Sequence, residues 1–173
     1  MPAEPQPAVR PAVPADAEPV AAIFAHYVTT SVATFEEVAP TAGQWRQRLA
    51  DRAAQNLPFV VAEADGSVCG YAYASPWRPK PGYRHTVEDT VYLAPGATGR
   101  GVGRMLLAEL LARAGQAGAR QMVAVIADAG AESEASVALH RAFGFADAGR
   151  LTAVGHKHGR WIDTVLMQRG LTP

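Results

Sequence analysis

Cysteine is nearly absent from this chain. Cys69 is the single one among 173 residues, which excludes an internal disulfide, and we expect it to pack as a small apolar side chain. No cluster of Cys and His has metal-ligand spacing, so no metal is expected. No apolar run approaches the roughly 18 residues of a membrane-spanning helix. The N-terminus also lacks the basic stretch and apolar core of a signal peptide.

An excess of charge of one sign is absent as well. The 16 Lys and Arg residues balance 16 Asp and Glu residues, so the net charge is zero. Such a balance gives no indication of a nucleic-acid partner or of a membrane surface as a partner. The missing signal peptide and the lack of a long apolar run favour a cytoplasmic protein.

The composition is that of a globular protein. Hydrophobic residues make up 49% of the chain and charged residues 18%, and the length suits one domain that can bury a core. Residues 1–8 are rich in Pro and Ala, and we expect them to form a disordered tail. Residues 9–173 are then expected to form a single domain.

The hydrophobic periodicity predicts strands and helices in mixed order. Strands are expected at residues 9–13, 59–64, 69–75, 86–93, 121–127, 145–151 and 162–168. Helices are expected from a cap at Asp16 past Tyr27, from a cap at Thr41 to about Ala54, from Gly101 or Val102 to about Gln116, and over residues 136–143, after a polar loop at residues 129–135. This order indicates an α/β (α+β) protein or a three-layer arrangement around one sheet.

The most informative segment is a glycine-rich turn between the strand 86–93 and an apolar helix. Glycines at positions 99, 101 and 103 leave little bulk over the first helical turn, and Arg100 and Arg104 add positive charge. Free backbone N–H groups and the helix dipole favour an anion at such a helix start. The turn predicts a phosphate or pyrophosphate site, although an ordinary glycine-rich turn between strand and helix also fits.

Two common phosphate motifs do not match this turn. A Walker A loop requires Lys where Val102 stands, and the G-x-G-x-x-G fingerprint fails because Arg104 or Leu106 stands at its last position. The pattern that remains is x-x-x-G-x-G at residues 98–103. It resembles the acyl-CoA pyrophosphate loop of GCN5-related N-acetyltransferases (GNAT), whose first position is usually Arg or Gln rather than Thr98.

Two longer segments extend the resemblance. Residues 71–92 (YAYASPWRPKPGYRHTVEDTVY) and 155–163 (GHKHGRWID) resemble the phosphinothricin and methionine sulfone N-acetyltransferase branch of that family. The likeness runs in order from about Val9 to Leu171. It implies the GNAT fold, in which helices flank a central mixed, mostly antiparallel sheet.

The resemblance also implies an activity. Acetyl-CoA would be the co-substrate, without a metal, and the acetyl group would pass directly, in a ternary complex, to an α-amine. The implied acceptor is a small amino-acid-like molecule such as phosphinothricin, methionine sulfone or methionine sulfoximine. A homodimer is implied as well.

The resemblance assigns cofactor contacts to one strand and one loop. The strand backbone near Tyr92 is implied to pair with the pantetheine arm, and the glycine turn is implied to bind the pyrophosphate. Ser133 stands where the family motif N-x-x-S-x-x-L-[HY] has Asn. The full set is Val91, Tyr92, Leu93, Gly99, Arg100, Gly101, Val102, Gly103, Arg104 and Ser133.

Acetyl transfer to an amine needs a base, and Glu88 is the candidate. Alternation along its strand puts Glu88, Thr90 and Tyr92 on one face and Asp89 on the other. An α-amine with a pKa near ~8 needs only a modest base, and the matching Glu is the base in the resembling enzymes. A solvated or salt-bridged strand residue is the alternative. Asp89 is expected to have a structural role.

His140 is the candidate acid. It ends the N-x-x-S-x-x-L-[HY] segment, where many relatives carry a Tyr that protonates the leaving thiolate. The ordinary pKa of histidine suits that step. The alternative is a helix histidine with a packing or hydrogen-bonding role.

The proline-rich loop after residue 75 is the candidate acceptor site. Arg78 and Lys80 can pair with a carboxylate or phosphinate, and a basic surface turn is the alternative. The other candidate acceptor contacts are Phe35, Trp77, Tyr83, Glu88 and Thr90. For residues 156–163 two roles stay open, support of this site and a dimer contact.

Two other functions stay open. One is an N-acetyltransferase for another amine or for a protein N-terminus, which an acidic groove would favour and the basic pair Arg78 and Lys80 disfavours. The other is an acyl-CoA-binding sensor without catalysis, which the presence of Glu88 disfavours.

Overall fold

The alternation of side chains along the strand β2 (Phe59–Ala64) divides the core into two halves. Phe59 and Val61 pack with one set of buried residues and Val60 and Ala62 with another, as expected when successive side chains point to opposite faces of a sheet. The first half contains the apolar faces of α1 (Ala17–Thr30) and α2 (Ala42–Ala54). The second contains those of α3 (Val102–Gln116) and α4 (Ala131–Ala142).

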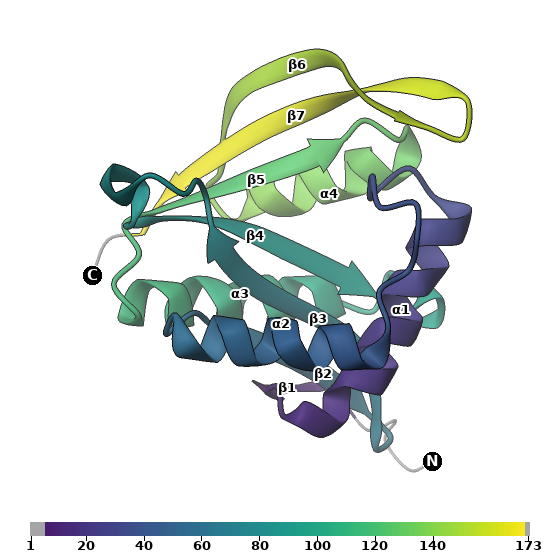
Figure 1. The fold of residues 1–173 in the computed structure, drawn as a ribbon, viewed down its shortest axis with the longest axis vertical. Helices are drawn as coiled ribbons and strands as arrows, with labels where there is room; N and C mark the ends of the chain where they lie inside the picture. Colours follow the sequence, from purple (N-terminus) through teal and green to yellow (C-terminus); the bar gives the residue numbers. More distant parts are fainter. Residues whose placement is uncertain (1–5, 172–173) are drawn as a thin grey trace.

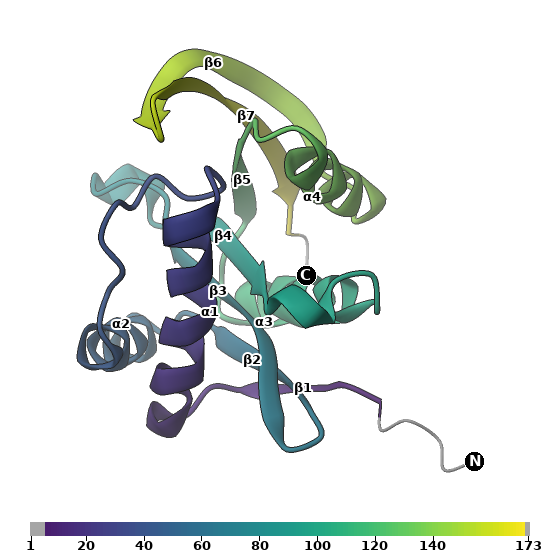
Figure 2. The same ribbon diagram turned by 90° about the vertical axis from the view of Figure 1, so that its right-hand side faces the viewer.

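These helices cover the two faces of one sheet. The computed structural model describes residues 6–171 and shows α1 and α2 on one side and α3 and α4 on the other (Figures 1 and 2). The remaining strands are β1 (Ala8–Pro11), β3 (Ser67–Pro76), β4 (Thr86–Leu93), β5 (Gln121–Ala127), β6 (Ala146–Lys157) and β7 (Arg160–Gly170). Within the described residues, no helix has the length and apolar character that a membrane crossing requires.

The seven-stranded sheet has the order β1-β2-β3-β4-β5-β7-β6. All neighbouring strands are antiparallel except β4 and β5, which run parallel. The expected mixed, mostly antiparallel sheet flanked by helices is therefore confirmed. The one parallel pair lies in the middle of the sheet, where the chain crosses over through α3.

The two predicted helix caps have different outcomes. Thr41 caps α2: its Oγ1 accepts a hydrogen bond from the Gln44 N–H at 3.2 Å, and Gln44 Oε1 accepts one from the Thr41 N–H at 2.8 Å. Asp16 directly precedes α1 but makes no side-chain cap there. Its carboxylate instead accepts hydrogen bonds from Arg10 at 2.8 and 2.9 Å and from the Val13 N–H at 2.8 Å.

Several element boundaries differ from those expected. The strand β1 begins at Ala8, inside the segment expected as tail, while residues 1–5 lie outside the described residues. The predicted loop 129–135 is wrong over most of its length, because α4 begins at Ala131. Alanine and glutamate favour a helix there, and the acidic residues in the first turn suit the positive end of the helix dipole.

The last two strands are longer than expected and form a hairpin. A two-residue turn with positive φ at His158 (49°) and Gly159 (71°) joins β6 to β7, a conformation that matches the twist of paired strands. In Figure 1 the tip of this hairpin lies above the C-terminal end of α1. The hairpin therefore reaches the segment that connects α1 to α2.

Candidate active site

A cavity opens where β4 and β5 separate. The two strands pair only from Thr86↔Gln121 to Glu88↔Val123, although β4 continues to Leu93 and β5 to Ala127. Beyond Glu88, the edge of β4 that faces β5 therefore has no neighbouring strand in the described structure. A cavity of about 690 Å³ occupies this region. Open backbone edges of this kind can pair with an extended ligand.

Most of the candidate residues line this cavity. Those from β4 and the connection after α1 are Glu88, Thr90, Val91, Tyr92, Leu93 and Phe35, and those from the glycine turn and α4 are Gly99, Gly101, Gly103, Arg104, Ser133 and His140. Residues up to about 100 positions apart in the chain therefore face one space. Arg100 and Val102 do not line it. Arg100 is exposed, and Val102, the first residue of α3, is buried in the core.

The glycine turn has the backbone form that an anion site needs. Gly99 and Gly101 have φ values of 73° and 79°, in the left-handed region that favours glycine. Gly101 is the N-cap residue of α3, and no acidic side chain lies in the first turn. Arg104 adds a positive charge at the cavity wall. The free N–H groups of this helix end and the nearby cation favour a phosphate group.

Glu88 lies at the point of strand separation. It is the last β4 residue paired with β5, and it is half-buried at the cavity wall. Burial, followed by the negative charge of Asp89, raises the pKa of the Glu88 carboxyl above its ordinary value. A carboxylate with a raised pKa is a stronger base, so this position suits proton removal from a bound amine.

Asp89 points to the other side of β4 and binds His140. The Nε2 atom of His140 lies 2.7 Å from Asp89 Oδ2, and its Nδ1 lies 2.7 Å from the Ser136 carbonyl oxygen. A carbonyl oxygen only accepts hydrogen bonds, so Nδ1 carries a proton. Burial disfavours the charged ring, but the hydrogen bond and charge of Asp89 outweigh it and raise the pKa of His140. Both ring nitrogens thus have partners inside the protein.

The comparisons with known proteins agree with this geometry. The family model described as Acetyltransferase (GNAT) family matches residues 21–145. This chain belongs to the GNAT acetyltransferase family. Phosphinothricin N-acetyltransferase of Alcaligenes faecalis is 51% identical over 156 residues, which cover 90% of this chain and 78% of the relative. The expected family and fold are therefore confirmed.

Two further relatives are similar over almost the whole acetyltransferase. The L-methionine sulfoximine/L-methionine sulfone acetyltransferase of Pseudomonas aeruginosa is 39% identical over 166 residues, 95% of each chain. A phosphinothricin acetyltransferase from Sinorhizobium meliloti, solved in complex with AcCoA, is 44% identical with a TM-score of 0.90, over 96% of this chain and 89% of that one. The similarity therefore includes both the cavity and the sheet around it.

Ser133 of the acetyltransferase lies in the first turn of α4 because that helix starts early. Its hydroxyl donates to the Gly130 carbonyl at 2.7 Å and accepts from the Ala129 N–H at 3.1 Å, and it lies 3.3 Å from an Asp128 carboxylate oxygen. The residue is buried at the cavity wall. Its hydroxyl thus holds the loop before α4, while its predicted cofactor contact stays a prediction.

The proline-rich loop does not line the cavity. Arg78, Lys80 and Tyr83 are exposed, and the Arg78 guanidinium carbon lies 5.0 Å from the centre of the Trp77 ring. The structure therefore does not bring these four predicted acceptor residues together with Glu88 in one cavity wall. The loop is a positively charged surface turn next to the start of β4, in which Arg78 stacks on Trp77.

Tyr27, Glu132 and Thr164 are among the cavity residues that sequence analysis missed. The Tyr27 hydroxyl donates to the Leu93 carbonyl at 2.5 Å, the Ser31 hydroxyl donates to Glu132 at 2.7 Å, and Thr164 has a buried hydroxyl without a partner among the described residues. Tyr27 belongs to the apolar pattern of α1, which marks it only as a core residue. Glu132 and Thr164 carry no motif, and only the fold brings them to the cavity.

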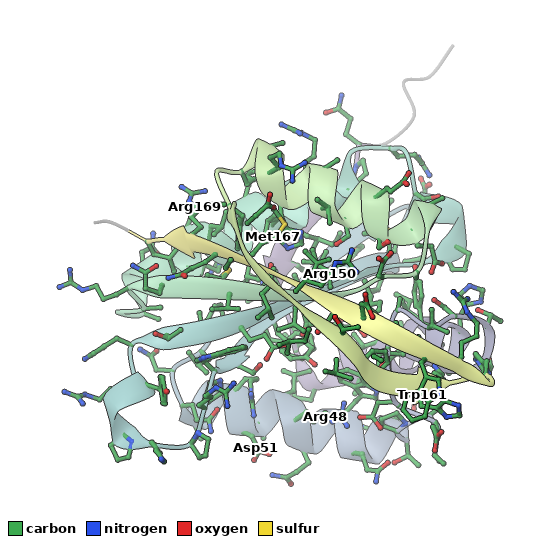
Figure 3. All side chains as sticks on the ribbon, turned by 90° about the horizontal axis from the view of Figure 1, so that it is seen from above. Arg48, Asp51, Arg150, Trp161, Met167 and Arg169 are labelled. Carbon is green, nitrogen blue, oxygen red and sulfur yellow. The ribbon has the colours of Figure 1, made fainter. Side chains whose placement is uncertain are left out.

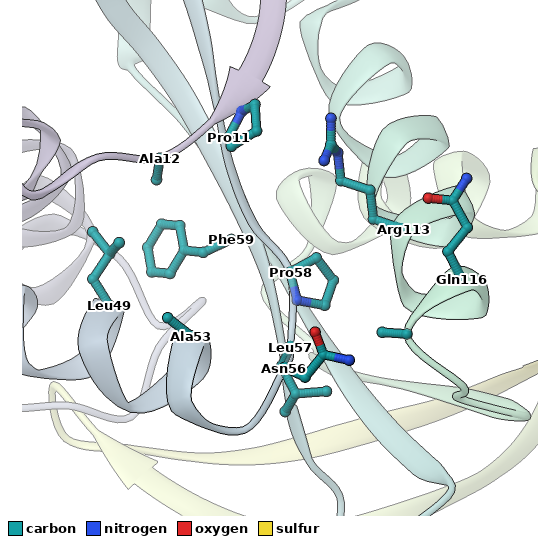
Figure 4. Close-up of a pocket in the computed structure, with 11 residues that line it drawn as sticks. Pro11, Ala12, Leu49, Ala53, Asn56, Leu57, Pro58, Phe59, Arg113 and Gln116 are labelled. Carbon is teal, nitrogen blue, oxygen red and sulfur yellow. The ribbon is translucent and has the colours of Figure 1, made fainter.

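A second cavity lies at the other end of α3. It has a volume of about 390 Å³ and lies between the C-terminal ends of α2 and α3, with Asn56 and Arg113 at its wall (Figure 4). None of the candidate residues lines it. Arg113 there is already paired with Glu109 at 2.7 Å. Among the described residues, no group of three or more metal-ligating side chains is found in either cavity or elsewhere.

Proposed function

We propose that this acetyltransferase transfers the acetyl group of acetyl-CoA to the α-amine of small amino acids of the phosphinothricin and methionine sulfoximine type. The observation that carries the proposal is the cavity between β4 and β5, which joins a glycine turn at a helix start to a half-buried carboxylate with a raised pKa. The names of relatives with 51% and 39% identity support this acceptor class.

The residues of the cavity fit acetyl-CoA in two places. The turn at Gly99 to Arg104 is proposed to hold the pyrophosphate through backbone N–H groups and positive charge. The open edge of β4 at Val91, Tyr92 and Leu93 is proposed to pair with the pantetheine arm. Bound there, acetyl-CoA supplies the acetyl group as a thioester.

Glu88 is proposed to act on the acceptor. As a carboxylate with a raised pKa, it removes a proton from the amine directly or through a water, which leaves the nitrogen lone pair free to attack. An N–H of the β4 backbone is proposed to stabilise the negative charge that develops on the carbonyl oxygen. Thr90 and Phe35 line the same cavity as Glu88 and are proposed acceptor contacts.

His140 is the proposed source of the proton for the leaving thiolate. Its pairing with Asp89 raises the pKa of the ring, and we propose that the charged ring, with a proton on each nitrogen, is the acid. Release of either proton requires that the ring exchange one present partner for the thiolate. Arg78 and Lys80 are proposed to attract the carboxylate or phosphinate of the acceptor as exposed cations, with Trp77 and Tyr83 beside them.

Release of CoA from acetyl-CoA tests the proposal. Phosphinothricin, methionine sulfone and methionine sulfoximine are expected to give saturable release, and plain amino acids and a short peptide are the comparison arms. Release only with the peptide would contradict the acceptor class in favour of protein N-termini. No release in any arm, with tight binding of acetyl-CoA, would support a sensor.

A homodimer in the cytoplasm is the assembly that we propose. Apolar side chains of the β6–β7 hairpin are exposed, with Leu151 at 47%, Val154 at 54% and Trp161 at 72%. Trp161 lies near the tip of the hairpin (Figure 3). Exposed apolar groups of this kind favour a protein contact. Sedimentation of the wild-type protein and of Trp161→Ser tests the dimer.

A further inference from the structure

One wall of the cavity is an irregular segment, residues 31–35, that follows α1. Ala33, Thr34 and Phe35 all line the cavity, and none of them lies in a helix or strand. A segment without its own backbone ladder takes its shape from its neighbours. The contacts that hold this segment therefore decide the shape of the cavity.

Lys157, near the end of β6, holds this segment through its backbone. Its ammonium group donates to the carbonyl oxygens of Ser31 at 2.7 Å, Thr34 at 2.8 Å and Tyr27 at 3.4 Å. The residue is only 2% exposed. An ammonium has three N–H donors, and here each has a backbone acceptor. Lys157 therefore has no donor left for a ligand, and its charge lies at the carbonyl end of α1, where the dipole favours a cation.

Gly155, two residues earlier on the same face of β6, holds the side chain of Phe35. A Cβ atom at position 155 would collide with the Phe35 ring, whose three nearest atoms all lie on the outer edge of the ring. The absence of that atom lets the aromatic ring lie against the strand backbone. The φ of Gly155 is not in the left-handed region, so the need for glycine is steric.

The same segment is also tied to one strand, β4, and one helix, α4, that form other parts of the cavity wall. Ser31 donates to Glu132 of α4 at 2.7 Å, and the Tyr92 hydroxyl of β4 donates to the Ala33 carbonyl at 3.3 Å. Both partners line the cavity themselves. A shift of residues 31–35 therefore changes the space next to β4, where Glu88 and Thr90 lie.

We propose that Gly155 and Lys157 are positioning residues that set the acceptor side of the cavity, Lys157 by fixing the backbone of residues 31–35 and Gly155 by giving the Phe35 ring its place. The inference rests on the proposed function. It assigns the β6 end of the hairpin to acceptor selection, because neither residue lies at the glycine turn or at the open edge of β4.

Lys157→Met removes the three hydrogen bonds but keeps a long side chain. We expect kcat/KM for the amino-acid acceptor to fall by about 10- to 100-fold, as for a displacement of about 1 Å near a reacting group. The Kd for acetyl-CoA is expected to stay within about twofold. Arg160→Met, which removes an exposed cation from the same hairpin, is the matched control. A folded Lys157→Met protein with wild-type kcat/KM would overturn the role of Lys157.

Gly155→Ala tests the second half of the proposal with Lys157 retained. The new methyl group displaces the Phe35 ring. We expect this to raise KM above the wild-type value, and to raise it more for a bulky acceptor such as phosphinothricin than for alanine. In a Phe35→Ala background the same change is expected to have little effect, because the collision is gone. Equal effects of Gly155→Ala in both backgrounds would overturn the role of Gly155.

Amide hydrogen exchange separates this proposal from the proposed function. The N–H groups of Ala33 and Glu36 are bonded to the hydroxyls of Ser31 and Thr34, so their exchange reports on the segment itself. Lys157→Met is expected to speed their exchange at least about tenfold without a change in α3. Unchanged exchange would overturn the positioning role whether or not the wild-type protein releases CoA. Absence of CoA release with the expected change in exchange would instead count against the proposed function alone.

Discussion

His140 Nε2 lies 2.7 Å from Asp89 Oδ2, and the two side chains are only 5% and 4% exposed. The pair connects α4 to β4 at the wall of the cavity. Aromatic contact supports the ring from one side, because its centre lies 4.9 Å from that of Phe145 in an edge-on arrangement. Asp89 thus lies on the face of β4 opposite to Glu88, as the alternation predicts, and it is bonded inside the protein. Its partner is His140, the residue predicted as the acid.

Asp89→Asn is expected to destabilise the protein strongly. Breaking one side of a buried ion pair leaves a charge without compensation, which costs about 3–5 kcal/mol. The pKa of His140 is raised in the folded protein, so the stabilising effect of its protonation is complete below the ordinary value of about 6.5 and is lost as pH rises through the folded value. The loss on mutation should therefore be larger at about pH 6 than at about pH 9.

Urea unfolding at the two pH values measures this effect. Asp147→Asn is the control, since Asp147 forms an exposed ion pair with Arg141 at 3.1 Å and exposed pairs contribute little. A loss for Asp89→Asn that is the same at both pH values would contradict a charged His140.

Glu88→Gln is expected to abolish most turnover while acetyl-CoA still binds. Removal of a positioned general base typically lowers kcat by about 10²- to 10⁴-fold. The Kd for acetyl-CoA should stay unchanged, because the glycine turn and the open edge of β4 are intact. Steady-state CoA release and calorimetric binding measure the two quantities. Glu109→Gln, in the middle of α3 and outside the cavity lining, is the control. Wild-type turnover in Glu88→Gln would remove Glu88 from the mechanism.

How far the sequence predicts this site depends on how many positions apart in the chain the contacting residues lie. The glycine turn, Glu88 and the 86–93 strand are local features, and their positions follow from the pattern of neighbouring residues. The contact between Asp89 and His140 joins residues 51 positions apart, and that between Lys157 and Thr34 joins residues 123 apart. No local pattern predicts such pairs. The acceptor loop was likewise predicted from its local sequence, and the position of its basic side chains outside the cavity wall follows only from the fold.

The pH dependence of turnover should show the raised pKa of Glu88. Burial and the charge of Asp89 raise it above the ordinary value of about 4.3, and the base acts only when deprotonated. We therefore expect kcat/KM to rise with pH along a limb centred above that value. Measured from about pH 5 upward, this limb should vanish in Glu88→Gln, while a limb from the acceptor amine near pH ~8 stays. A wild-type profile without the lower limb would argue against a buried carboxylate base.

Gly101→Ala tests the glycine turn against a close control. With φ of 79° at this position, a side chain costs about 1–2 kcal/mol of strain in the left-handed region, and relief of that strain turns the first N–H groups of α3 away from the anion site. We expect the KM for acetyl-CoA to rise about tenfold or more, since several charge-assisted hydrogen bonds depend on that orientation. The KM for the acceptor should change little. Gly96→Ala in the same turn is the control, because its φ is not left-handed and no atom lies within 4 Å of its new Cβ. Equal effects of the two substitutions would mean that the turn needs only small residues, not the left-handed backbone at Gly101 that directs its N–H groups.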